Sequence, residues 1–148
     1  MSDYIVKIVP KDPQYRVSKH RINDILLYLK NTVVAEHIDG NLYETPQFID
    51  CGSNLEKIYC PVCSKVIGVD WWAEKMDIAS ENNFEDLEVK LPCCGNKSSL
   101  NDLQYHYSCG FACIVFELFN PTTELTSDYI VSLEKLLGTY VRVIRSHL

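Results

Sequence analysis

The sequence predicts an α+β fold, a ferredoxin-like βαβ-βαβ sandwich with a cysteine-rich insertion between its two halves. A strand, helix, strand order occurs at each end of the 148-residue chain. The segment between these ends differs in composition, because it holds most of the cysteines and both tryptophans. We therefore expect residues 1–38 and 111–148 to form the sandwich and residues 39–110 to form an inserted lobe.

The first half begins with residues 4–9, a run rich in β-branched side chains that predicts a strand before Pro10. Ser18 is the expected N-cap of the helix that follows. The apolar face of this helix is expected to contain residues at helical spacing: Ile22, Ile25, Leu26 and Leu29. Residues 32–38 are expected to form a short second strand, closed by a turn at Asp39-Gly40.

The second half begins with residues 111–119, an almost unbroken apolar run typical of a strand buried on both faces. Asn120-Pro121 is expected to end that strand. A helix is predicted from about Ser127, with Gly138 placed to cap its carboxyl end. Residues 140–145 complete the pattern as the last strand. Two such units pair most economically as four antiparallel strands with two helices on one face.

Charge and cysteine usage limit the classes of function. The formal charge of −6 disfavours nucleic acid and anionic membranes as partners. The chain has neither a secretory signal nor a run of about 18 apolar residues, so we expect a cytoplasmic protein without a membrane span. An odd number of cysteines, seven, in a reducing compartment favours thiols and metal ligands over a disulfide framework.

The inserted lobe contains two recognisable elements. Residues 70–79 predict a short helix with Trp72, Met76 and Ala79 along one side. Residues 87–91 alternate between apolar and polar side chains, as a half-exposed strand does. That strand leads directly into the sequence Pro92-Cys93-Cys94-Gly95. The lobe is therefore predicted to be small and ribbon-like.

The sequence Cys60-Pro61-Val62-Cys63 is the strongest functional motif. A Cys-x-x-Cys turn holds two thiolates close enough to bind one zinc ion at about 2.3 Å each, and backbone N–H groups of the turn can donate to the sulfurs. A thioredoxin-like redox motif is the competing interpretation, but it belongs between a strand and a helix in a parallel fold. Further cysteines thirty residues later favour the metal site.

The second half of the metal site is expected at Cys93 and Cys94. Neighbouring residues in extended backbone point to opposite faces, so both thiolates reach one ion only if the chain bends between them. Gly95 favours such a bend. We predict one structural zinc ion on four cysteines: Cys60, Cys63, Cys93 and Cys94. The alternative is that one of the adjacent cysteines binds together with another residue: Cys109, His106 or Cys51.

Three other features could have either a functional or an ordinary structural role. Cys113 lies inside an apolar run and is expected to be a core thiol. Trp71-Trp72 is expected to pack on the core rather than to form a ligand platform. Glu117 is a lone carboxylate in an apolar strand, so it is paired, at the solvent face, or functional. No catalytic set of nucleophile, base and orienting residue can be assembled.

A set of short motifs carries a family resemblance: Cys60-Pro61-Val62-Cys63, Trp71-Trp72, Leu91-Pro92-Cys93-Cys94-Gly95, Ser99-Leu100-Asn101-Asp102-Leu103, Gly110-Phe111-Ala112 and Asn120-Pro121. With these motifs the chain resembles a family of small, uncharacterised bacterial proteins with a zinc-ribbon-type insertion. The likeness covers about the last ninety residues, and it departs from ordinary zinc ribbons at the adjacent cysteines. It implies a bacterial cytoplasmic setting and no particular activity.

Three functions fit these observations. The first is a non-enzymatic module with a structural zinc that binds another protein. The alternative is a zinc-dependent hydrolase, which needs an open coordination position beside Glu117 or Asp102. The less favoured third is nucleic-acid binding, which requires four cations on one face: Lys90, Lys97, Arg142 and Arg145.

Overall fold

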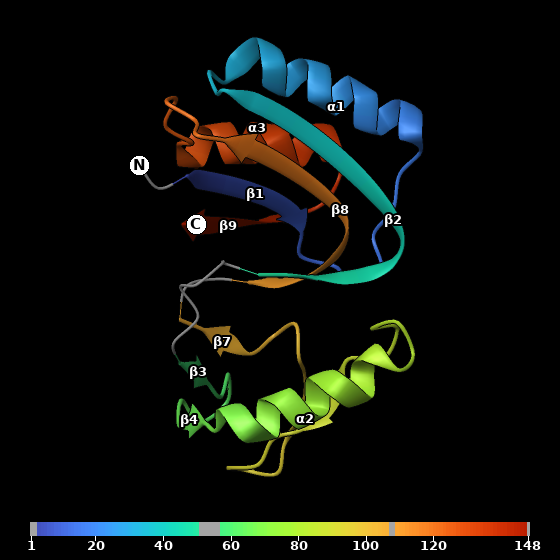
Figure 1. The fold of residues 1–148 in the computed structure, drawn as a ribbon, viewed down its shortest axis with the longest axis vertical. Helices are drawn as coiled ribbons and strands as arrows, with labels where there is room; N and C mark the ends of the chain where they lie inside the picture. Colours follow the sequence, from blue (N-terminus) through green and yellow to red (C-terminus); the bar gives the residue numbers. More distant parts are fainter. Residues whose placement is uncertain (1–2, 51–56, 107–108, 148) are drawn as a thin grey trace.

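A four-stranded antiparallel sheet joins the two ends of the chain. The structure, a computed structural model, describes residues 3–50, 57–106 and 109–147. The sheet contains β1 (Tyr4–Pro10), β2 (His37–Ile49), β8 (Gly110–Phe119) and β9 (Val141–His147), in the order β2-β8-β1-β9. Each neighbouring pair is antiparallel. The fold is therefore mixed α/β, and its largest sheet is built from strands near the two ends of the chain, including residues 39–49, which were expected in the insertion (Figure 1).

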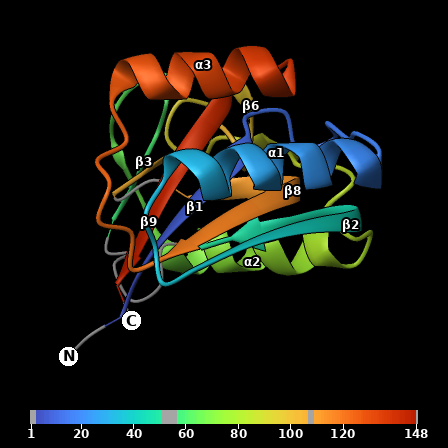
Figure 2. The ribbon, with the colours of Figure 1, turned by 90° about the horizontal axis from the view of Figure 1, so that it is seen from above.

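Two helices cover one face of this sheet. They are α1 (Lys19–Thr32) and α3 (Ser127–Leu137), which lie side by side above the strands (Figures 1 and 2). The predicted caps are confirmed. The Ser18 side chain accepts a hydrogen bond from the backbone N–H of Arg21, and Gly138 ends α3 in the left-handed conformation at φ 87°.

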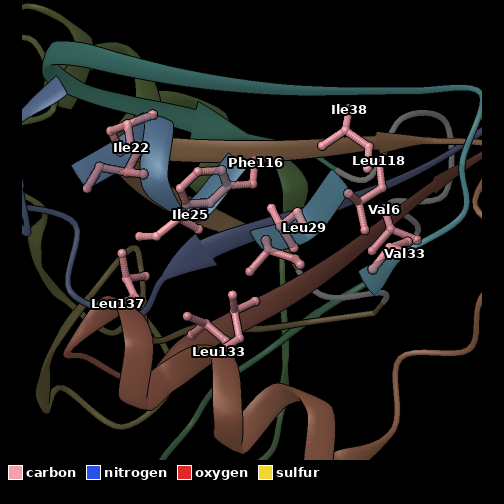
Figure 3. Close-up of a cluster of buried hydrophobic side chains, with 13 residues drawn as sticks. Val6, Ile22, Ile25, Leu29, Val33, Ile38, Phe116, Leu118, Leu133 and Leu137 are labelled. Carbon is pink, nitrogen blue, oxygen red and sulfur yellow. The ribbon is translucent and has the colours of Figure 1, made fainter. Parts of the chain in front are cut away.

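The main core lies between the sheet and these helices. Alternate residues of β1 and β8 point toward the helices because side chains of a strand alternate between its two faces. They pack against the buried stripe of each helix (Figure 3). The buried members are Val6, Ile8, Ile22, Ile25, Leu29, Val33, Ile38, Ile114, Phe116, Leu118, Leu133, Leu137 and Val141. The free energy gained by burying this cluster is the main contribution that holds the two ends of the chain together.

The expectation that the second strand ends at Asp39-Gly40 is wrong. The helix before it runs to Thr32, and β2 begins at His37 and continues through Asp39 and Gly40 to Ile49. Gly40 serves close packing instead of a turn, since a Cβ at this position would lie 3.1 Å from both Leu26 Cγ and Phe116 Cδ1. A glycine here lets α1 approach the sheet.

The long strand β2 bends together with β8. Their pairing register shifts between Leu42 and Gln47, so β2 carries extra residues at this point. Beyond the shift, the two strands curve beneath the sheet (Figure 1). Their far ends contribute to a second buried cluster on the face opposite the helices: Val9, Ile49, Ala112, Val115 and Ile144. The bend thus covers part of that face and carries the chain toward the cysteines.

Residues 57–106, which we call the cysteine lobe, form small sheets and one helix below the main sheet (Figure 1). One sheet has the order β4-β3-β7, and the other pairs two further strands. The elements are β3 (Ile58–Tyr59), β4 (Val66–Ile67), α2 (Val69–Ser80), β5 (Glu88–Lys90), β6 (Lys97–Ser99) and β7 (Gln104–Tyr105). The lobe has a hydrophobic cluster of its own, and Phe111 at the start of β8 belongs to it.

The predicted elements of the lobe are confirmed. The expected helix over 70–79 is α2, with Ala79 buried in the lobe core. The expected strand over 87–91 contains β5. Trp71 and Trp72 are both half-buried and pack on the lobe cluster, as expected for core residues. None of the helices within the described residues combines the length and apolar character that crossing a membrane requires.

The packing at Gly40 gives a first prediction. Gly40→Ala is expected to lower the free energy of unfolding by about 1–3 kcal/mol, because the added methyl group presses on Leu26 and Phe116 in a filled core. Chemical denaturation measures the change. Gly68→Ala is the matched control, since its Cβ would meet nothing within 4 Å. Equal stability of the two variants would contradict the assigned packing.

Candidate metal centre

The first cysteine turn is closed by two backbone hydrogen bonds. The Cys60 N–H donates to the Lys65 carbonyl at 2.8 Å, and the Ser64 N–H donates to the Cys60 carbonyl at 3.0 Å. Ser64 adopts a positive φ of 63°. Within the turn, the N–H groups of Val62 and Cys63 donate to the Cys60 sulfur at 3.3 and 3.4 Å. This is the hydrogen-bonded thiolate turn expected of a Cys-x-x-Cys metal knuckle.

The second turn repeats the backbone of the first. The Leu91 N–H donates to the Asn96 carbonyl at 2.8 Å, and the Gly95 N–H donates to the Leu91 carbonyl at 3.0 Å. Gly95 has φ 72°, close to the value at the fifth residue of the first turn. Leu91 therefore occupies the place of Cys60, and Cys94 occupies the place of Cys63.

The adjacent cysteines have different positions in this repeated turn. Cys94 corresponds to the second cysteine of a regular knuckle, whereas Cys93 corresponds to Val62, which is no ligand in the first turn. Residues 92–94 form a turn rather than extended backbone, and successive side chains of a helical turn lie about 100° apart. Both sulfurs can therefore face the same point. Leu91, in the place of the missing cysteine, is 2% exposed and packs in the lobe core.

The four predicted cysteines come together. The sulfur atoms of Cys60, Cys63, Cys93 and Cys94 all lie within 4.8 Å of one another and could hold a metal ion. The Cys60 and Cys94 sulfurs are 3.9 Å apart, and those of Cys63 and Cys93 are 3.2 Å apart. Tetrahedral coordination at about 2.3 Å places sulfurs about 3.8 Å apart. A single ion at the centre of the group matches this spacing.

The thiols perturb one another strongly. Burial acts to raise the pKa of Cys60, but the N–H groups of Cys63 and Val62 and the neighbouring thiols lower it to about 6. The hydrogen bond with the Cys63 thiol, followed by burial, raises the pKa of Cys93 to about 12. Four thiolates this close repel one another unless a cation lies between them. A cation bound by this group would therefore displace the thiol protons.

The alternative ligands do not join this group within the described residues. Cys109 is buried at the start of β8, and its carbonyl accepts a hydrogen bond from Arg142. His106 is exposed after β7. Cys51, the third alternative, lies outside the described residues. Cys113 is a fully buried core thiol, as expected, and burial raises its pKa.

The candidate acids are not arranged around the sulfurs. Glu117 is half-buried in the main sheet, opposite Lys7 on one side and Asp39 on the other. Its carboxylate accepts a 3.4 Å hydrogen bond from Asn41. Asp102 is exposed in the turn between β6 and β7. Glu117 is thus a carboxylate on the sheet face away from the helices, with a polar neighbour.

The sequence contains a signal that reveals the second turn. The hexapeptides at 60–65, CPVCSK, and 91–96, LPCCGN, share proline at their second position and cysteine at their fourth. Aligning them predicts two equivalent turns and shows that Leu91 replaces the first cysteine. The bend expected between Cys93 and Cys94 is thus part of a repeat of the first turn, which cysteine spacing alone does not reveal.

Comparisons of the chain with known protein families, with curated proteins and with solved structures find no match in any of the three. The assignment of the site therefore depends on the geometry of the cysteines alone.

The repeated turn makes a sharp prediction. Cys93→Ser is expected to lose bound metal, and adding Leu91→Cys to that variant is expected to restore it. The double variant has a regular Cys-Pro-x-Cys turn at 91–94, with the same backbone as the first turn. Metal per chain, measured by mass spectrometry of the purified proteins, is the readout.

Leu91→Cys alone is the control and is expected to keep its metal through Cys93. A double variant that remains metal-free while folded would refute the equivalence of the two turns.

Proposed function

We propose that Cys60, Cys63, Cys93 and Cys94 bind one structural zinc ion, and that the protein is a non-enzymatic module that binds another protein. The observation that carries the zinc site is the convergence of four sulfurs from two turns within 4.8 Å. Tetrahedral sites made of thiolates bind zinc or iron. Zinc is proposed because such closed four-cysteine sites are its usual structural environment.

The donor set supports a structural role over hydrolysis. Four cysteines fill all four positions of a tetrahedral ion and leave none for water. A zinc ion with four thiolates also has a net charge of −2, which disfavours ionisation of a bound water. Glu117, the carboxylate that a hydrolase was expected to use, belongs to the main sheet instead of the cysteine lobe.

The positions of the cations give no support to nucleic-acid binding. Arg142 is engaged in hydrogen bonds with Asn101 and Cys109, and Lys97 pairs with Glu88 at 3.6 Å. Arg145 is three residues from Arg142 on β9, so the two side chains point to opposite faces of the sheet. Lys90 and Lys97 are cross-strand partners in the β5–β6 pair of the cysteine lobe, whereas Arg142 and Arg145 lie on opposite faces of β9, so the four cations do not form one basic face.

Exposed apolar side chains favour a protein partner. Val62, Val66 and Val69 follow one another around the first cysteine turn and are 57%, 61% and 56% exposed. These valines lie on three consecutive elements, in the first cysteine turn, in β4 and at the start of α2. Exposed apolar side chains that form a patch are typical of interaction surfaces. We assign these three valines to the partner contact.

The ferredoxin-like sandwich remains our proposal for the fold. In chain order, the four strands of the main sheet have the spatial order second, third, first, fourth, and all neighbours are antiparallel. A helix follows the first and third of these strands. This arrangement supports a sandwich built from the two ends of the chain with an insertion between them, although the division expected at residues 38/39 falls inside β2, whose residues through Ile49 pair with β8 in the main sheet. A reducing, cytoplasmic location fits the thiolate ligands.

Metal analysis tests the proposed site. The purified protein is expected to contain one zinc ion per chain, and Cys94→Ser is expected to contain none. The same variant is expected to lose about 4 kcal/mol or more of unfolding free energy, because metal binding contributes directly to folding. Since Cys94 is exposed, its change to serine would cost less than about 0.5 kcal/mol if no metal were bound.

Cys113→Ala is the matched control, a cysteine outside the four-sulfur group that is expected to retain full zinc. Iron in place of zinc would overturn the choice of metal. A wild-type protein that is fully stable without any metal would overturn the site itself.

A further inference from the structure

The turn between β6 and β7 joins the cysteine lobe to the main sheet through Asn101. This side chain is polar but only 4% exposed. Its amide donates to the Lys11 carbonyl at 2.8 Å, and its Oδ1 accepts from the Phe111 N–H at 2.9 Å. Lys11 directly follows β1 and Phe111 is the second residue of β8, so one lobe residue is bonded to the chain at the end of β1 and at the beginning of β8.

Arg142 of β9 completes the same network. Its guanidinium donates to Asn101 Oδ1 at 3.2 Å, to the Asn101 carbonyl at 3.1 Å and to the Cys109 carbonyl at 2.9 Å. The group occupies space left by Gly110, where a Cβ would lie 2.1 Å from Nη1 of Arg142. Buried networks of this kind are stabilising only while every member keeps its partner. The junction therefore tolerates little displacement of Asn101.

The two cysteine turns fix both ends of the segment that carries Asn101. The second turn continues directly into β6 (Lys97–Ser99). At the other end, β7 (Gln104–Tyr105) pairs with β3, the strand that enters the first turn at Cys60. An ion that holds the two turns together thus sets the distance between the ends of residues 97–105. Asn101 lies in the middle of this span.

We propose that metal binding and the docking of the cysteine lobe on the main sheet are energetically coupled through Asn101 and Arg142. Asn101 and Arg142 are positioning residues, and the metal sets the docked orientation of the lobe that presents the proposed partner contact. This inference rests on the proposed zinc site. Coupling of two equilibria is reciprocal, so any change that disturbs docking must weaken metal binding by the factor by which metal favours docking.

Aromatic contacts at the same junction fix the orientation of the lobe less strictly than the hydrogen bonds of Asn101 and Arg142 do. Phe111 packs against Phe48 and Phe84 at ring-centroid distances of 5.2 and 5.3 Å, and Trp72 packs edge-on against Phe48 at 5.8 Å. These contacts hold the lobe near the sheet but tolerate small rotations, because apolar packing is less directional than hydrogen bonding. The hydrogen bonds of the polar network therefore determine the orientation of the lobe on the main sheet, and this orientation is the one that depends on the metal.

Zinc affinity of Gly110→Ala, measured by competition with a chromogenic chelator, tests the coupling. The added Cβ would lie 2.1 Å from Arg142 Nη1 and 3.0 Å from Asn101 Oδ1, so it displaces the guanidinium from the network. Zinc is expected to bind with one ion per chain but roughly 5- to 150-fold more weakly, the usual range of coupling between sites. Gly68→Ala, a glycine of the lobe with open space around its Cβ, is expected to keep wild-type affinity. Unchanged affinity in folded Gly110→Ala would overturn the inference.

Arg142→Lys is the second variant if Gly110→Ala does not fold, since it keeps the charge but loses the planar guanidinium that donates to three acceptors. It is expected to weaken zinc binding in the same range, and wild-type affinity would overturn the coupling. A wild-type protein that binds no zinc would instead reject the proposed function, so the two failures are distinguishable.

Hydrogen exchange of the wild-type protein gives a readout that general destabilisation would not produce. Removal of zinc with a chelator is expected to reduce protection of the Phe111 amide, which donates to Asn101. The amides of Val6 and Leu118 in the centre of the main sheet are expected to stay protected. Loss of protection at all three amides, or at none, would contradict coupling through the junction.

Discussion

The close approach of four cysteine sulfurs is the constraint on which the cysteine lobe depends, because these sulfurs would repel one another as thiolates. Two turns with the same pair of backbone hydrogen bonds bring these sulfurs within 4.8 Å of one another. A cation bound at their centre would convert this repulsion into attraction, and the short strands on either side provide little stability of their own. β3, β4 and β7 contribute only two residues each. The shape of the lobe therefore follows from its turns more than from its sheets.

The sequence predicts the composition of the site better than its symmetry. Residue type and the Cys-x-x-Cys spacing are sufficient to predict Cys60 and Cys63 as a pair, and Gly95 indicates the bend that lets the adjacent cysteines point to one place. The substitution of Leu91 for the expected cysteine hides the repeat, because a search for cysteine spacing cannot see a turn whose first ligand is absent. Its physical reason is visible only in three dimensions, where Leu91 fills the lobe core.

The course of β2 shows why local turn signals can fail. Asp39-Gly40 is a common turn sequence, but in this fold the glycine provides space for Leu26 of α1. Pairing with β8 continues on both sides of Gly40, and the hydrogen bonds of a long antiparallel ladder outweigh a local preference. The helices and the central strands were predictable because their apolar periodicity reflects the same core that forms in the fold. The register shift after Leu42 has no comparable signal in the sequence.

Two kinds of contact meet at the junction between the lobe and the main sheet, and they have different consequences. Burial of Phe48, Phe84 and Phe111 provides attraction that depends mainly on area. The hydrogen-bond network of Asn101 and Arg142 stabilises the junction only at one geometry. A buried donor or acceptor that loses its partner incurs a desolvation penalty. A lobe held by aromatic contacts alone would stay attached yet vary in orientation. The polar network selects one orientation, and the segment that carries it lies between the two cysteine turns, so the order of the sulfur site and the order of the junction depend on each other.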